Sequence, residues 1–125
     1  MSEYVYRVLL PDQKPEWCDV TSAGTFRIRA GELFDAHHHD CDEYWLVFEG
    51  RARVSVNGEQ VHIGPGDIVC TPVGVTHDIE AVAGPLSMHW FETATPPGGR
   101  LGHLHRSDEQ AAGHSVEELA ATTLA

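Results

Sequence analysis

The feature that most constrains the fold is a regular series of short strand-like runs separated by turn signals. Between residues 25 and 92 there are about seven or eight such runs, and none has the 3.6-residue period of an amphipathic helix. Asn57-Gly58 is the strongest turn signal, because both central residues of a type I′ hairpin need positive φ. Tyr44 to Phe48 is apolar on both faces, which predicts a strand covered on both sides. The pattern predicts an all-β sandwich or barrel.

The length of 125 residues suits one domain with its own apolar core. We expect an N-terminal arm or edge strand over residues 1–20, in which Tyr4 to Leu10 alternates between apolar and polar positions. A barrel should follow over residues 21–95, and a C-terminal tail over residues 96–125. An edge strand needs a partner for its hydrogen bonds.

The tail begins with a Pro- and Gly-rich linker and contains two sequence signals for a helix start. Ser107 with Gln110, and Ser115 with Glu118, have the spacing of a capping box. The tail has few apolar residues. We therefore leave three alternatives open: it is docked on the barrel, docked on a partner subunit, or frayed.

The charge balance limits the partners of the chain. With 19 acidic and 8 basic side chains the formal net charge is −11, and such a surface repels phosphate backbones and anionic lipid head groups. We therefore expect neither nucleic acid nor a membrane as a partner. The three cysteines, Cys18, Cys41 and Cys70, are an odd number without CxxC spacing, which favours a reducing compartment. No run is apolar and long enough to span a bilayer, so we expect a soluble, cytoplasmic protein.

Residues 37–43, HHHDCDE, hold the densest group of potential metal ligands. On a strand, His37 and His39 point to one side and His38 to the other, so the first two can bind one ion together with the carboxylate of Glu43. Imidazole and carboxylate are ligands that zinc, iron, nickel, manganese and copper accept. A histidine-rich surface loop would give the same letters and stays the alternative for this stretch taken alone.

The spacing of this stretch resembles the first motif of the cupin family. After a glycine and five further residues comes His-x-His, then a glutamate, and finally a second glycine. The matching positions are Gly31, His37, His39, Glu43 and Gly50.

The second cupin motif is also present, except at its last position. Gly66 is followed after five residues by Pro72-x-Gly74, and after two more by His77. The family commonly has asparagine four residues after this histidine, whereas this chain has Ala81. That difference affects a supporting hydrogen bond and leaves the ligands in place. The turn at Pro72-x-Gly74 returns His77 beside the strand that carries the other two histidines.

The resemblance implies a double-stranded β-helix, or jelly-roll barrel, with a short helical or irregular tail. It also implies one divalent transition metal ion (Fe, Zn, Mn or Ni) held by His37, His39, Glu43 and His77, with coordination positions left open as in catalytic sites. Cupin barrels commonly pair, so we expect a homodimer. A small molecule is the expected ligand or substrate.

Two further sets of residues bear on the chemistry. Glu43 and His89 are candidate catalytic groups, although an outward-facing His89 is an equal alternative because Leu86, Met88 and Trp90 have the pattern of the buried face. His103 and His105 repeat the His-x-His spacing in a loop-like region without a nearby glutamate. A loop is the favoured interpretation there, and a second metal site is the alternative.

The resemblance indicates a range of functions, because one fold hosts many activities. Our first hypothesis is a metal-dependent enzyme acting on a small metabolite, of the dioxygenase or isomerase class or else a lyase or cyclase. The second is a non-catalytic module that binds or senses a small molecule. The four ligands favour the enzyme, and the scarcity of other inward acids and bases favours the binding module.

Overall fold

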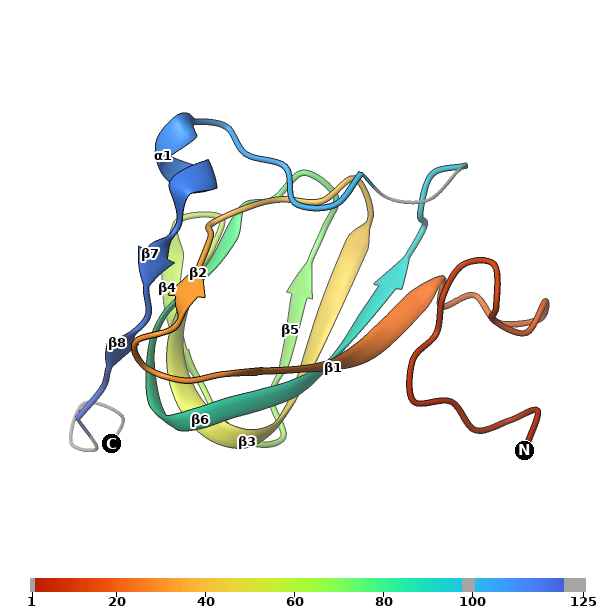
Figure 1. The fold of residues 1–125 in the computed structure, drawn as a ribbon, viewed down its shortest axis with the longest axis horizontal. Coiled ribbons are helices and arrows are strands. Elements are labelled where there is room, and N and C mark those ends of the chain that lie inside the picture. The colour runs from red at the N-terminus through yellow and green to blue at the C-terminus, as the bar shows by residue number, and fades with distance from the viewer. Residues whose placement is uncertain (1, 98–100, 121–125) are drawn as a thin grey trace.

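Two long, bent strands organise the fold in the computed structural model, which describes residues 2–97 and 101–120 (Figure 1). These strands are β3 (Asp42–Val56) and β6 (His77–Thr93), and they pair antiparallel from one end to the other. The register shifts near Glu49, where β3 bends. Each long strand therefore contributes to both layers of the barrel.

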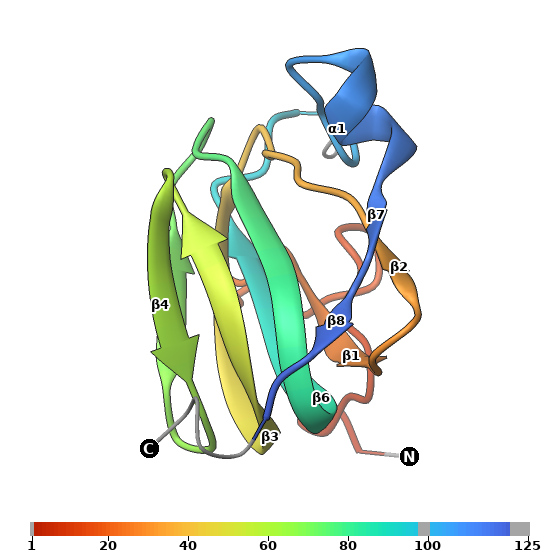
Figure 2. The same cartoon turned by 90° about the vertical axis from the view of Figure 1, so that its left-hand side faces the viewer.

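Three of the four shorter strands of the six-stranded main sheet come from residues 22–71. They are β1 (Ser22–Ile28) on β6, and β4 (Glu59–Ile63) and β5 (Ile68–Thr71) on β3. The first half of β3 pairs with β5 and its second half pairs with β4. The sheet thus folds over on itself, and Figure 2 shows β4, β3 and β6 side by side in one layer. The predicted all-β cupin architecture is confirmed.

The strand count differs from the prediction because two pairs of runs are continuous. The predicted runs before and after Gly50 both belong to β3, and those before and after Gly84 both belong to β6. Both glycines have positive φ, 82° and 70°, so the chain turns without leaving the ladder. The predicted hairpin at Asn57-Gly58 is present, with φ of 52° and 79°.

The apolar core fills the space between the layers. Its fully buried members include side chains from both long strands and one from the C-terminal segment: Val54, Ile79, Val82, Leu86, Met88 and Val116. β3 alternates, with Glu43, Trp45 and Val47 buried and Phe48 52% exposed. The prediction that Tyr44 to Phe48 is covered on both sides was therefore wrong, because the outer face is only half-buried at Tyr44 and Leu46 and exposed at Phe48.

The N-terminal arm does not form the predicted strand. Within Tyr4 to Leu10, the described pairing is one isolated antiparallel bridge, from Leu9 to Ala23 of β1. Tyr4 and Val5 are 78% and 72% exposed, so the arm buries little apolar surface to fix it as a strand.

The C-terminal segment is docked on the barrel. Helix α1 (Asp108–Ala112) begins at the predicted cap, where Ser107 Oγ accepts the backbone N–H of Gln110 at 3.1 Å. The second predicted helix start, at Ser115, was wrong. The chain there forms β7 (His114–Ser115), paired with β2 (Leu33–Phe34), and β8 (Glu117–Glu118), paired with β6.

Extended pairing prevails over the capping signal at Ser115 because it buries Val116 and Leu119 against the barrel. The predicted division into residues 1–20, 21–95 and 96–125 stays a prediction for the boundaries themselves. In the described part of the chain, no helix combines the length and apolar character needed to cross a membrane.

Candidate metal centre

Three buried imidazoles from two separate segments meet inside the barrel. His37 and His77 form an antiparallel bridge, with backbone N–H to O distances of 3.1 and 2.9 Å. His39 follows on the same side of its segment, as the alternation predicted. The ring nitrogens that His37, His39 and His77 can offer to an ion all lie within 4.8 Å of one another.

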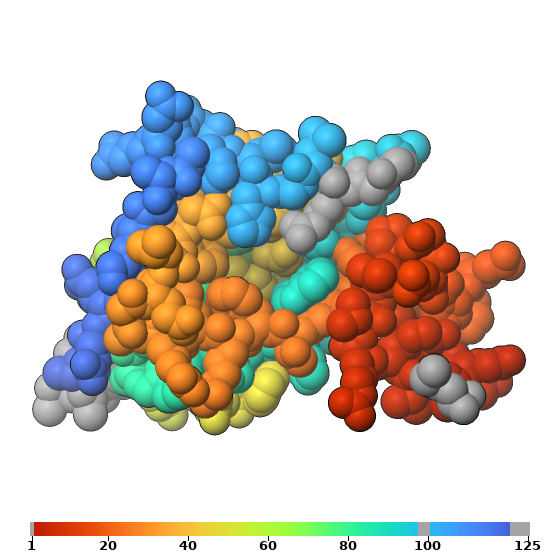
Figure 3. Space-filling view, in the orientation of Figure 1, coloured from red at the N-terminus to blue at the C-terminus, as the bar shows by residue number. Residues whose placement is uncertain are grey.

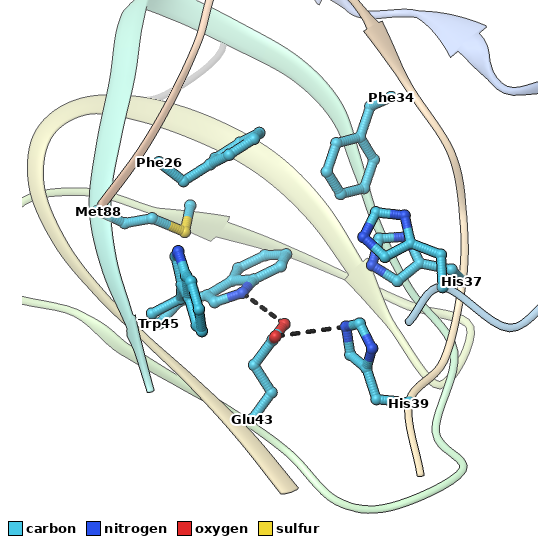
Figure 4. A pocket seen from close by; sticks show the side chains of 9 residues that line it. Phe26, Phe34, His37, His39, Glu43, Trp45 and Met88 are labelled. Atoms are coloured by element: carbon cyan, nitrogen blue, oxygen red, sulfur yellow. Dashed lines mark hydrogen bonds and ion pairs between the residues drawn. The ribbon is translucent and has the colours of Figure 1, made fainter. Parts of the chain in front are cut away.

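Glu43 on β3 supplies the carboxylate of this cluster. Its Oε2 lies 3.3 Å from Nε2 of His39, and its Oε1 lies 3.3 Å from Nε2 of His77. The indole N–H of Trp45 donates to Oε1 at 2.9 Å, and Figure 4 shows the carboxylate held between Trp45 and His39. The structure therefore brings together His37, His39, Glu43 and His77, the four residues predicted as ligands.

Backbone carbonyls orient two of the rings. Nδ1–H of His37 donates to the carbonyl oxygen of Asp35, and Nδ1–H of His39 donates to that of Gly102 at 3.0 Å. With Nδ1 protonated, Nε2 is the nitrogen left to bind a metal, and such outer partners usually fix the tautomer of metal-binding histidines. The assignment puts Nε2 of His39 on the side of Glu43.

Burial and neighbouring charge set the protonation of the cluster. Burial, with the nearby His77 and His103, lowers the pKa of His37 to about 3. Burial alone would raise the pKa of Glu43, but the close approach of His39, His77 and Glu92 to its carboxylate outweighs burial and lowers that pKa below its ordinary value. A neutral imidazole and an ionised carboxylate are the forms that coordinate a metal ion.

The residues present fit a divalent transition ion. His77 is 0% exposed, yet neither of its ring nitrogens has a hydrogen-bond partner among residues 2–97 and 101–120. A buried polar group without a partner costs about 1–3 kcal/mol. A metal bound through Nε2 would satisfy one of these nitrogens, and the three-imidazole, one-carboxylate donor set suits zinc, iron, manganese or nickel.

An open cavity of about 190 Å³ adjoins this cluster. Its walls are mainly aromatic and apolar, with the polar groups at one end: Phe26, Phe34, His37, His39, Glu43, Trp45, Met88, Trp90 and His103. Figure 4 shows Phe26 and Met88 facing Phe34 across the space above Glu43. The cavity is thus an apolar cup with its polar groups at one end, a form that suits a small organic molecule.

Sequence reasoning missed two acidic residues at this site. Asp35 accepts hydrogen bonds from His103 Nδ1 at 3.0 Å and from His105 Nε2 at 2.7 Å. Glu92 is 0% exposed beside Glu43, its partner across β3 and β6, and accepts the hydroxyl of Ser22 at 2.6 Å. Glu92 could have been found from its even spacing with Met88 and Trp90, whereas Asp35 carried no motif.

His89 and His38 lie away from the cavity. His89 is exposed on the outer face of β6, where its ring centroid lies 5.0 Å from that of Phe48 and it lines a groove beside the N-terminal arm. The outward alternative is the one that the structure shows, so the catalytic role considered for His89 has no geometric support. His38 Nδ1 accepts from Arg106 at 3.1 Å and takes no part in the three-imidazole cluster.

A family model described as "Cupin domain" matches residues 24–94, more than half of the chain. The chain belongs to the cupin family. Among curated relatives, the uncharacterized protein y4oW of Sinorhizobium fredii is 39% identical over 71 residues, which are 57% of this chain and 33% of that protein. Mannose-1-phosphate guanylyltransferase ManC of Salmonella typhimurium is 43% identical over 44 residues, 35% of this cupin and 9% of that protein. The cupin thus spans a third or less of the length of these relatives.

Solved structures share the fold. The DMSP lyase DddQ from Ruegeria pomeroyi has a TM-score of 0.58 and 22% identity, covering 67% of this cupin and 43% of that chain. Salicylate 1,2-dioxygenase from Pseudoaminobacter salicylatoxidans, solved with gentisate, has a TM-score of 0.57 and 23% identity, covering 67% and 23%. At these identities the likeness shows the fold alone.

Proposed function

We propose that this cupin is a metal-dependent enzyme that acts on a small metabolite. One divalent transition ion (Fe, Zn, Mn or Ni) would be held by His37, His39, Glu43 and His77. The observation that carries the proposal is the fully buried His77. Its ring nitrogens have no hydrogen-bond partner in the described part of the chain, although Nε2 lies 3.3 Å from the ionised carboxylate of Glu43. A bound ion would act as a Lewis acid toward a substrate oxygen or, if redox-active, would bind dioxygen.

The cavity limits the size and character of the substrate. Its volume of about 190 Å³ is slightly larger than the roughly 150 Å³ apolar cavity that is known to take up benzene. Phe26, Phe34 and Trp90 would pack against a flat or apolar body and keep water from it. A single ring, or an aliphatic molecule of that size, with an oxygen atom directed toward the histidines fits this space.

Among the reaction classes, we favour a dioxygenase. An isomerase, a lyase and a cyclase are the alternative activities of such a metal-dependent enzyme. The gentisate-bound dioxygenase and the DMSP lyase are cupin-fold enzymes that use small molecules, and the aromatic lining here suits a ring. Within the cavity, Glu43 is the carboxylate positioned to hold or move a proton, and Trp45 fixes its orientation. Glu43 is thus the candidate catalytic residue of the chain.

A non-catalytic binding module is the second candidate. Apart from the ligand residues, His103 is the only titratable side chain lining this cavity among the described residues. A mainly apolar lining with so few acids and bases suits binding of an apolar molecule as well as its chemical conversion. Turnover of the bound molecule separates the two candidates.

The test is metal analysis of the protein purified without added metal, followed by oxygen-uptake and isomerase assays with single-ring hydroxy acids. We expect one tightly bound ion in the wild type, and its loss in His77→Ala and Glu43→Gln with the circular dichroism spectrum retained. His62→Ala is the matched control, because His62 is an exposed histidine on β4, away from the cavity. An unchanged ion content in both site variants would refute the metal centre, and ligand binding without product would favour the binding module.

We also propose that the protein is a cytoplasmic homodimer. The outer face of the sheet exposes apolar side chains, Phe48 at 52% and Ile68 at 62%, next to a groove lined by Tyr4, Tyr6 and His89. A two-fold pair would bury this patch against its own copy and keep the acidic surfaces apart. Among the described residues Cys18, Cys41 and Cys70 form no disulfide, which is consistent with a reducing compartment. Light scattering should give twice the chain mass, and Phe48→Glu should return it to that of one chain.

A further inference from the structure

A second His-x-His sequence lies directly beside the first. His38 and Leu104 form an antiparallel bridge, with N–H to O distances of 2.9 and 3.0 Å in the two directions. In an antiparallel pair, opposite residues point to the same side, so the neighbours of His38 and those of Leu104 share one face. Figure 3 shows the light-blue C-terminal chain lying against the orange part of the chain that precedes β3. The pairing explains why four imidazoles, at positions 37, 39, 103 and 105, gather at one end of the barrel.

The carboxylate of Asp35 lies at the centre of the outer part of this group. Its Oδ2 lies 3.0 Å from Nδ1 of His103 and 2.7 Å from Nε2 of His105. Nδ1 of His37 is 3.4 Å away, but its proton is already directed to the Asp35 carbonyl. Asp35 therefore has two further imidazole nitrogens at hydrogen-bonding distance from one oxygen.

We propose that Asp35, His103 and His105 form a second metal site at the mouth of the cavity, which takes a divalent transition ion such as Zn²⁺. Two imidazoles and one carboxylate are the ligand set of open three-residue zinc sites. Each nitrogen that now faces Oδ2 would face the ion, after small rotations of exposed side chains. The side chains are 25%, 46% and 23% exposed, so an ion can enter from solvent.

This second site adjoins the buried centre, because the rings of His37 and His103 stack with centroids 3.7 Å apart, but it has its own ligands. None of its ligands belongs to the set His37, His39, Glu43 and His77. Asp35 comes from the loop before His37, and His103 and His105 come from the C-terminal segment. An ion there would join the C-terminal segment to the loop that carries Asp35, two stretches that His38 and Leu104 already link by backbone hydrogen bonds of 2.9 and 3.0 Å. We expect weaker binding than at the buried centre, because three partly exposed ligands replace four buried ones.

The test is a Zn²⁺ titration of the full chain, stripped with a chelator, by equilibrium dialysis and metal analysis. The wild type should bind two ions. His105→Gln should bind one: glutamine can still donate a hydrogen bond to Asp35, so the contact between the segments is kept while a metal ligand is lost. Its affinity for the second ion should fall at least about tenfold, since even outer partners of metal ligands contribute that much. His77→Ala should lose the other ion, and the double variant should bind none.

The outcomes are distinguishable. A wild type that binds one ion, with His105→Gln giving the same curve, would overturn the second site. Loss of an ion in His62→Ala as well would show scattered binding to surface histidines and would overturn it too. If His77→Ala keeps both ions, the buried centre fails while the second site stands. Zn²⁺ should also raise the urea midpoint of His77→Ala but leave that of the double variant unchanged.

Discussion

Replacement of Gly50 by alanine should have a large effect on stability although the residue touches no ligand. Gly50 has φ of 82°, where an L-residue pays about 1–2 kcal/mol. A Cβ at this position would lie 2.1 Å from the carbonyl oxygen of Pro85, a backbone atom of β6 that cannot rotate away. Forcing extra volume into packed structure typically costs about 1–3 kcal/mol more. The free energy of unfolding should therefore fall by about 2–5 kcal/mol.

Gly31 provides the matched control for Gly50. It has a similar φ of 89°, but a Cβ there meets nothing within 4 Å. Gly31→Ala should cost only the backbone term of about 1–2 kcal/mol. Urea unfolding followed by tryptophan fluorescence measures both variants. With a slope of about 1–3 kcal/mol per molar urea, the midpoint of Gly50→Ala should lie below that of Gly31→Ala by roughly half a molar or more. Equal midpoints would show that the close approach of β3 to Pro85 does not matter.

Three further predictions concern the site and the C-terminal segment. Trp45→Phe removes the hydrogen bond to Glu43 and should weaken metal binding about 10–100-fold with the fold intact, as measured by competition with a chromogenic chelator. Val116→Ala removes two buried methyl groups and should lower stability by about 1.6 kcal/mol in urea unfolding, whereas an unchanged midpoint would mean that the segment is not part of the core. Burial would lower the pKa of His114, but its hydrogen bond to Asp78 raises it above 6.5, so this pair stabilises the fold below pH 6.5 and that contribution is lost as pH rises through the raised pKa. The stability difference between wild type and His114→Ala should thus shrink, by at most about 1 kcal/mol, from pH 6 to pH 8.5.

The barrel and its four inward ligands could be predicted from the sequence because they depend on local rules. Alternation along a strand places His37 and His39 on one side, and turn residues return His77 to them. The Asn57-Gly58 hairpin and the Ser107 cap depend on single residues whose backbone preferences are strong. These features need no knowledge of contacts between distant parts of the chain.

The features that were missed depend on long-range pairing. Asp35 gains its importance from His103 and His105, about 70 positions away, and nothing in its neighbours reveals them. The extended path near Ser115 follows from burial of Val116 in the barrel, which outweighs a local helix signal. In the N-terminal arm a local signal misled the prediction. Tyr4 to Leu10 alternates like a strand, but it pairs with β1 through the single bridge of Leu9.

The family match ends at residue 94, yet the carbonyl that orients His39 belongs to Gly102 and a wall of the cavity belongs to His103. A chain truncated at the end of the family match would therefore lack the carbonyl that orients His39 and one wall of the cavity. Natural sequence changes near Gly102 and His103 can therefore reshape the entrance of the cavity while strands β1 to β6 stay as they are.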